Sequence, residues 1–379
     1  MAYGLFSVSF ALFLSARNLS ALMIGVVLTV ALLAGAAFSF ATGYLVRRFG
    51  RRATLTGAAA LMAVAAAILA AGHGLALIIL ASLLGTLSAG GQEVGPFAPI
   101  EQHMVADTTE HRNVARYFAW YNFAGSLAAA GGALLAGFVA LTVAPWLYAA
   151  CGVMLLLIYA ALPAEVAART STEQTLDSTI ASAQQSSGVA EKLTVLFGID
   201  ALAGGFVVQS FLAYWLHVRF GVEQNVLGPL FFATNILSGL SFLVAAQVAK
   251  RIGLLRTMVF THLPSNVLLS LVPFMPTFWW AAALLLARFA LSQMDVPTRQ
   301  AFTMYAVRPD ERARAAGMTN AVRPAAAAIA PVFSGLALQT AAIGLPFFLA
   351  GGLKIAYDLA MLALFSRTPL TLDEVEGRK

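Results

Sequence analysis

Several ionisable side chains lie inside long apolar stretches of this chain, and they could carry proton or ion chemistry. A charged side chain at bilayer depth costs roughly 2.5–3.5 kcal/mol on insertion scales, so such groups are expected to face one another or water. They are four acids and three bases: Glu93, Asp200, Asp295, Asp358, Arg288, Arg323 and Lys354. Burial disfavours the ionised form of a carboxylate that lacks a cation. Because acids are in excess, we expect one of these carboxylates to bind and release a proton.

The spacing of these residues separates candidate functional groups from a structural pair. Asp295 follows Arg288 by seven residues, which predicts one helix face and a separation of roughly 10 Å along it. Lys354 and Asp358 are four residues apart, so we interpret them as an ion pair within one helix. The alternative for the whole set is structural ion pairing between helices. Two amides in apolar stretches are further candidates for binding a polar solute: Gln209 and Gln293.

The stretches that hold these residues predict membrane-spanning helices. Hydrophobic residues make up 60% of the chain and charged residues 11%, whereas a soluble chain has about 25% charged residues. A spanning helix needs roughly 20 apolar residues, and uninterrupted apolar runs favour helices over strands. The fold class we expect is an all-α membrane protein with twelve transmembrane helices. The predicted spans are 1–16, 21–46, 54–72, 75–100, 116–141, 143–163, 192–217, 226–249, 255–275, 277–298, 313–341 and 343–366.

The first predicted span is short for a bilayer. A secretory signal is the competing interpretation, but no basic residues precede the apolar run. At the offset of the internal repeat described below, Met1 aligns with Gly204, which lies well inside the seventh span. We therefore expect a transmembrane helix that lacks its first turns.

Basic residues determine the predicted orientation. The loops on one side hold most of them, including the cluster at 47–52, and the loops on the other side hold only Arg17 and Arg219. Because cytoplasmic loops carry the excess of Lys and Arg, both termini are expected in the cytoplasm. We predict a multi-pass protein of the cytoplasmic (inner) membrane. The net charge of +6 reflects this asymmetry and does not indicate nucleic-acid binding.

A weak internal repeat divides the chain into halves. The stretch 43–50 (GYLVRRFG) aligns with 246–253 (AQVAKRIG) at an offset of 203 residues. Between the halves the chain is rich in Ser, Thr and Gln, as in a flexible linker. A duplicated helical unit is typical of secondary transporters. The predicted organisation is a six-helix bundle over 1–163, a cytoplasmic linker over 164–191, a second six-helix bundle over 192–366 and a cytoplasmic tail over 367–379.

The loop after the second span carries a motif, GYLVRRFGRR at 43–52. Its spacing resembles the loop signature of the major facilitator superfamily, Gly-x-Leu-Ala-Asp-Arg-x-Gly-Arg-Arg. Arg47 stands where the family has an aspartate, and Lys250 occupies the same place in the second half. The resemblance implies a part in closing the cytoplasmic gate; the alternative is that these cations only fix topology. The residues assigned to the gating motif are Gly43, Arg47, Arg48, Gly50, Arg51, Arg52, Lys250, Arg251 and Gly253.

The resemblance also implies a mechanism. Family members place spans 1, 4, 7 and 10 around a central cavity, which would bring most of the charged residues toward one pathway. We expect a proton-coupled secondary transporter of a small organic solute that works by alternating access, with efflux favoured. Uptake or facilitated diffusion is one alternative, and a non-transporting sensor or assembly factor of the same fold is another. The residues assigned to proton coupling or substrate binding are Glu93, Asp200, Arg288, Asp295, Arg323, Gln209 and Gln293.

Other chemistries lack their motifs in this sequence. The only cysteine is Cys151, so neither an internal disulfide nor a thiol cluster for a soft metal is expected. No G-x-x-x-x-G-K-[ST], H-E-x-x-H or G-x-S-x-G run occurs. The five histidines are scattered, and we interpret each as structural or interfacial. We expect no enzyme activity, cofactor, metal or nucleic-acid partner. The expected partners are a small-molecule substrate, protons and the lipid bilayer, and the expected state is a monomer.

Overall fold

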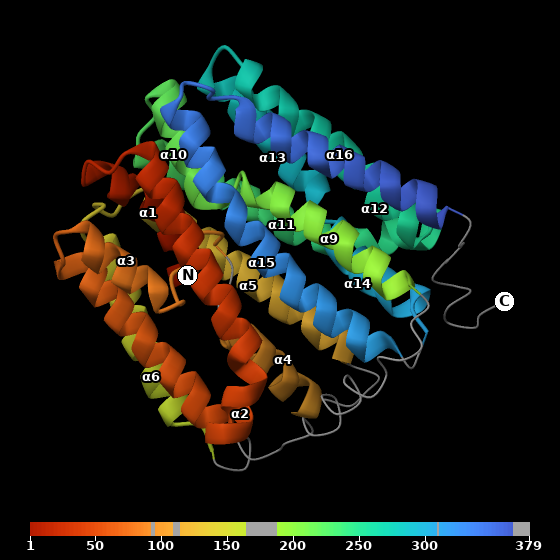
Figure 1. Ribbon diagram of the computed structural model, residues 1–379, viewed down its shortest axis with the longest axis horizontal. Helices are drawn as coiled ribbons and strands as arrows, with labels where there is room; N and C mark the ends of the chain where they lie inside the picture. Colours follow the sequence, from red (N-terminus) through yellow and green to blue (C-terminus); the bar gives the residue numbers. More distant parts are fainter. Residues whose placement is uncertain (92–94, 109–113, 164–187, 309–310, 367–379) are drawn as a thin grey trace. The chain divides into compact units, whose positions relative to one another are not determined.

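The computed structural model describes residues 1–91, 95–108, 114–163, 188–308 and 311–366. For a few of these it describes the backbone alone, at 102–103, 105–108, 114–119 and 313. Within these ranges all regular secondary structure is helical (Figure 1). The predicted site residue Glu93, the predicted linker over most of its length and the predicted tail lie outside the described residues.

The twelve predicted apolar spans all correspond to helices. Among the described residues, six helical stretches are long and apolar enough to cross a membrane, as judged by length and composition, and the helices Ala2–Ala16 and Ala144–Ala160 are shorter apolar segments. The helices that match predicted spans without an interruption are α1 (Ala2–Ala16), α5 (Val114–Ala136), α6 (Ala144–Ala160), α11 (Gln224–Ile252), α12 (Leu254–Leu271, followed by the short helix η3, Val272–Phe274), α15 (Arg312–Gln339) and α16 (Leu345–Phe365).

Three predicted spans are each divided into two helices. The divided spans are α3 (Leu75–Leu83) with α4 (Phe97–Thr108), α9 (Val189–Gly205) with α10 (Gln209–Phe220), and α13 (Phe278–Ser292) with α14 (Asp295–Ala306). Between α3 and α4, three glycines adopt positive φ angles, which glycine does at little cost. Discontinuous spans are the elements from which many transporters build their binding sites.

The second and third predicted spans form one helical run, α2 (Ala21–Ala71), with a kink at Gly50. Gly50 has φ 80° and ψ 162°, and Gly253, immediately before α12, has φ 88° and ψ 162°. This region of backbone conformation is essentially restricted to glycine. The two glycines of the repeated motif therefore make the same turn in both halves of the sequence.

The first compact unit comprises Met1–Thr172, Val207–Phe232 and Ala328–Ile343. Within it α1 packs against α5, α6 and α10, and α2 packs against α3 and α6. Small residues at the contact between α1 and α5 allow the two backbones to approach closely, as membrane helices commonly do.

The second compact unit comprises Glu173–Phe206, Ala233–Ala327 and Gly344–Lys379. Its α12 contacts α13, α14 and α16, and α9 packs on α16. In Figure 1 the α12 and α16 ribbons run side by side. Buried apolar side chains from these helices form its core, among them Leu193, Phe197, Met258, Phe302 and Met361. The bundle boundaries expected from the repeat stay a prediction.

Candidate functional site

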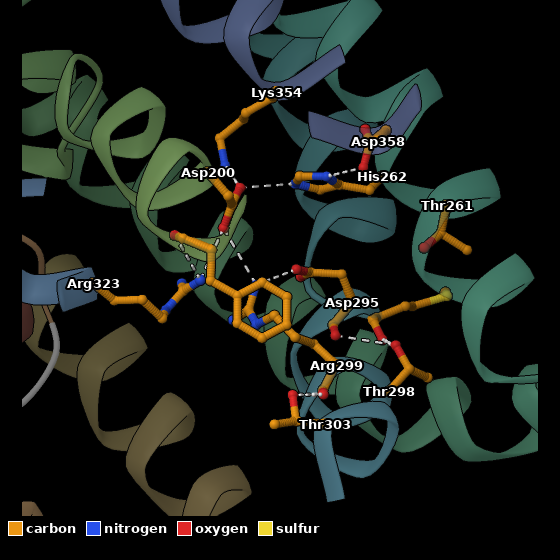
Figure 2. A network of polar contacts seen from close by, with 12 residues as sticks. Asp200, Thr261, His262, Asp295, Thr298, Arg299, Thr303, Arg323, Lys354 and Asp358 are labelled. Carbon is orange, nitrogen blue, oxygen red and sulfur yellow. Dashed lines mark hydrogen bonds and ion pairs between the residues drawn. The ribbon is translucent and has the colours of Figure 1, made fainter. Parts of the chain in front are cut away.

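Asp200 lies at the centre of a buried cluster of charged side chains in the second unit (Figure 2). It belongs to α9 and is 3% exposed. Its Oδ2 accepts hydrogen bonds from Nη1 of Arg323 at 3.1 Å and from Nη1 of Arg299 at 3.3 Å. Its Oδ1 accepts a hydrogen bond from Nζ of Lys354. One carboxylate therefore joins cations from α14, α15 and α16.

Arg299 links this carboxylate to a second one, Asp295. The two residues are four apart on α14, and Nη1 of Arg299 donates to Oδ2 of Asp295 at 2.5 Å. Asp295 is the first residue of α14, where the helix N-terminus favours negative charge. Both side chains are buried. A change in the charge of either carboxylate would therefore alter the interactions of the other, because both contact the same guanidinium.

His262 on α12 lies between two carboxylates (Figure 2). Its Nδ1 is 2.9 Å from Oδ1 of Asp358, and its Nε2 is 3.8 Å from Oδ1 of Asp200. Asn266, one turn further along α12, donates from Nδ2 to Oδ2 of Asp358 at 2.9 Å. Histidine is the side chain type that changes charge near neutral pH. A proton gained or lost on this ring would change the charge beside Asp200.

The predicted ion pair between Lys354 and Asp358 is wrong. Lys354 instead donates to Asp200 on α9, and Asp358 contacts His262 and Asn266 on α12. Residues four apart on a helix can meet. Here α16 packs against both α9 and α12, and each neighbour supplies a partner of complementary charge or hydrogen-bonding character.

Arg288 is buried but is not part of this network. It lies on α13 and is 9% exposed, and its Nε has no hydrogen-bond partner among the described residues. Its guanidinium lies 4.8 Å from the ring centroid of Phe289. The expectation that Arg288 and Asp295 lie on one continuous helix is wrong, because α13 ends at Ser292 and α14 begins at Asp295. That the two side chains face one pathway stays a prediction.

The remaining predicted binding residues are dispersed. Gln209 is the first residue of α10 in the first unit, and its Nε2 donates to Oγ of Ser7 at 2.9 Å. Gln293 is half-buried in the interruption between α13 and α14. Glu93 lies outside the described residues. Of the seven predicted site residues, the structure joins Asp200, Asp295 and Arg323 in one ion-pair network.

The gating motif shows both exposed and buried positions. Arg47 and Arg48 are exposed near the end of the helical segment before Gly50, and Arg51 is buried. Arg52 donates a hydrogen bond to the carbonyl oxygen of Ala160, near the end of α6. In the second half, Lys250 and Arg251 occupy the last turn of α11, where cations interact favourably with the helix dipole.

Two members of the charged cluster, Arg299 and His262, are not among the residues predicted from the sequence. Arg299 resembles the other basic residues on the cytoplasmic side, although its position four residues after Asp295 is a signal for pairing on a helix. His262 resembles the other scattered histidines, although Asn266 follows it on the same helix face. Among the described residues, no group of three or more His, Cys, Asp or Glu side chains could hold a metal ion.

Comparison with known proteins identifies the family. Residues 1–331 match the family model described as Major Facilitator Superfamily. The chain belongs to the major facilitator superfamily. A yeast relative, the uncharacterized membrane protein YJR124C of Saccharomyces cerevisiae, is 25% identical over 407 residues, covering 96% of this chain and 91% of that protein.

Solved structures of several transporters share the fold of this chain. The nucleoside transporter NupG superposes with a TM-score of 0.74 at 14% identity, covering 96% of this chain and 95% of that one. A point mutant of NupG gives a TM-score of 0.76 at the same identity of 14%. A D-xylose-proton symporter gives a TM-score of 0.68 at 14% identity, covering 95% of this chain and 93% of that one. These likenesses confirm the expected all-α, twelve-helix superfamily fold.

Proposed function

We propose that this superfamily member is a proton-coupled secondary transporter of a small organic solute, acting by alternating access in the cytoplasmic membrane. The observation that supports the proposal is the buried cluster around Asp200, where one carboxylate is shared by Lys354, Arg299 and Arg323 and is approached by His262. Charges within a membrane bundle are costly and are typically retained for transport or proton movement.

The cluster offers a way to couple proton binding to helix movement. Lys354 and His262 both face Oδ1 of Asp200, at hydrogen-bond distance and at 3.8 Å respectively. A proton on His262 places a second cation beside that oxygen, and its loss leaves Lys354 as the main partner. Because these residues come from α9, α12 and α16, the proton changes which helix contacts are favoured.

The carboxylates Asp200 and Asp295 contribute to proton coupling through changes in which cations they pair with. Asp295 is held by Arg299 in this arrangement, and Asp200 is held by three cations. A carboxylate takes up a proton readily only when a neighbouring cation moves away, since an opposite charge favours the ionised form. We infer that proton uptake at Asp295 or Asp200 accompanies a rearrangement of Arg299, which touches both.

Transport by vesicles tests the function. Purified protein in liposomes with an entrapped pH indicator would be given sugars, nucleosides, amino acids and organic acids on one side of an imposed pH gradient. Solute-dependent proton movement is expected, and its direction in vesicles of known orientation decides between efflux, which we favour, and uptake. Flux of every solute that ignores the gradient would contradict proton coupling.

A variant pair sharpens this test. Asp295→Asn is expected to abolish coupled flux while leaving the folded protein intact, because Arg299 keeps its contact with Asp200. Glu223→Gln is the matched control, since Glu223 is an exposed acid of the first unit. Normal coupling in the Asp295 variant would move the proton site to another residue.

A further inference from the structure

Arg288 is a buried cation that forms no ion pair with any carboxylate among the described residues. It is nine-tenths buried, its Nε makes no hydrogen bond, and no ion pair or hydrogen bond joins its guanidinium to any residue that the structure describes. Its guanidinium lies over the ring of Phe289. A single cation–π contact compensates only part of the desolvation cost of a buried guanidinium. Such a group is stabilised when an anion arrives to pair with it.

The charges of the second unit leave room for such an anion. Each of the three acids in the charged cluster has a partner: Asp200 has Lys354 and two arginines, Asp295 has Arg299, and Asp358 has His262 and Asn266. Counted with neutral histidine, these acids number one fewer than the cations that lie among them, which are Arg288, Arg299, Arg323 and Lys354. Within this set the surplus is one positive charge, and it corresponds to Arg288, which pairs with none of the described acids.

A second unused polar group lies one turn from Arg288. Ser292 is four residues further along α13 and is 5% exposed, and its Oγ has no hydrogen-bond partner among the described residues. Residues four apart lie on the same face of a helix. A guanidinium supplies a planar fork of donors that matches a carboxylate, and a hydroxyl can donate once more. The two groups together are suited to a carboxylate or a similarly shaped monoanionic head group.

From these observations we infer that Arg288 and Ser292 form the anion-binding part of the transport site, and that the solute is a small organic monoanion such as a monocarboxylate. This inference rests on the proposed transport function and adds the substrate class. A monoanion balances the surplus charge, whereas a neutral solute leaves Arg288 unpaired and a dianion reverses the imbalance.

Thermal unfolding of the full-length protein in detergent tests the inference with pairs of isosteric probes. The probes are acetate against acetamide, lactate against lactamide, benzoate against benzamide, and methanesulfonate, with sodium chloride to correct for salt. A ligand that binds only the folded state raises the unfolding temperature. At least one carboxylate or the sulfonate is expected to raise it in a saturable manner, while the matching amide does not. Equal effects of acid and amide, or no saturable shift by any of the anions, would overturn the inference.

Variants connect the effect to the residue. Arg288→Gln is expected to weaken the apparent affinity for the anion at least about tenfold, because one charge-assisted contact is lost. Arg288→Lys is expected to retain part of the affinity. Ser292→Ala is expected to weaken the affinity by less than Arg288→Gln does. Arg256→Gln, at an exposed position of α12, is the matched control and should bind as the parent does. Unchanged affinity in Arg288→Gln would contradict the assignment. If that variant does not fold, the Lys variant and the isostere pairs still decide the question.

The two proposals fail in different ways. Proton-driven flux of a neutral solute that Arg288→Gln leaves intact would overturn the anion inference and leave the transport function standing. Arg288-dependent anion binding without flux of that anion under any gradient would instead contradict the transport function.

Discussion

Gly50 and Gly253, 203 residues apart, adopt the same backbone conformation, with φ 80° and ψ 162° at the first and φ 88° and ψ 162° at the second. The two glycines that align in the sequence repeat thus also share a backbone conformation. Each glycine stands between two helical segments, at the turn where the motif's basic residues gather. The turn depends on a conformation that other residues rarely adopt.

Gly50→Ala is expected to destabilise the protein by about 1–3 kcal/mol, the usual cost of holding a residue in a sparsely populated conformation. The effect would come from the backbone alone, because a Cβ at this position meets no described atom within 4 Å. The measurement is the shift in thermal unfolding temperature relative to the parent protein.

The same helical run provides the control for Gly50→Ala. Gly57 also has open space around an added Cβ, but its backbone is helical. Gly57→Ala is therefore expected to stabilise by about 0.5–1 kcal/mol, since alanine is the better helix former. Equal effects of the two substitutions would show that the turn at Gly50 carries no conformational strain for alanine.

The fold is predictable from the sequence because the bilayer sets the length of each apolar run. The interruption between α9 and α10 is not predicted: its flanking sequence contains Gly204 and Gly205 but no proline, and glycine pairs are also common within intact membrane helices. In the tenth span Pro297 is the residue that indicates a bend. The interruption instead follows Ser292, because proline is accommodated in the first turn of α14.

The site is predictable only in part. Acids such as Asp200 and Asp295 are conspicuous inside apolar runs, but their partners depend on which helices become neighbours. Spacing along one helix suggests Lys354 with Asp358, whereas packing joins Lys354 to α9. Arg299 is indistinguishable in sequence from a topological anchor, because basic residues are common at the cytoplasmic ends of helices.

Gly132→Ala in α5 is expected to destabilise the first unit and lower the unfolding temperature. An added Cβ would lie 1.9 Å from the carbonyl oxygen of Met1 and 2.8 Å from the amide nitrogen of Leu5, so the backbones of α1 and α5 would have to separate. Backbone atoms cannot move aside as a flexible side chain can, and overpacking typically costs about 1–3 kcal/mol.

Gly125 is the matched position on the same helix, where an added Cβ meets no described atom within 4 Å. Gly125→Ala is expected to leave stability unchanged or slightly raised. Similar losses in both variants would mean that α5 tolerates alanine poorly for a reason other than its contact with α1.

Arg299→Gln is expected to destabilise the second unit by about 3–5 kcal/mol, because removing one partner leaves a buried charge uncompensated. Arg299 is the only cation that pairs with Asp295 among the described residues. By contrast, Arg288→Gln is expected to leave the unfolding temperature of the unliganded protein unchanged or higher, since it removes a buried cation that forms no ion pair with a described residue.

A double variant separates charge pairing from packing at Arg299. Asp295→Asn combined with Arg299→Gln removes both charges, so its loss of stability should be smaller than the sum of the two single losses. Additive losses would indicate that the two side chains contribute independently, against the coupling that their 2.5 Å contact implies.

His262→Gln is expected to reduce the dependence of the transport rate on pH when rates are compared from about pH 5 to about pH 8. A proton on the ring adds a cation beside Asp200 and Asp358, and loss of that proton removes the cation. The groups that face the ring are these two carboxylates, Asn266 and Tyr357. Glutamine keeps the capacity for hydrogen bonding to Asp358 but carries no charge, so the variant should resemble the protein with a neutral ring at every pH.

Initial rates of vesicle flux measured across this pH range check the outcome. His73→Gln is the matched control, because His73 is exposed in a loop of the first unit and contacts a backbone carbonyl oxygen. A pH profile that responds equally to both substitutions would assign the dependence to surface histidines. If His262→Gln has the same pH profile as the parent protein, the coupled proton would be assigned to a carboxylate and not to the histidine. Asp200 and Asp295 are then the candidates, because both contact Arg299.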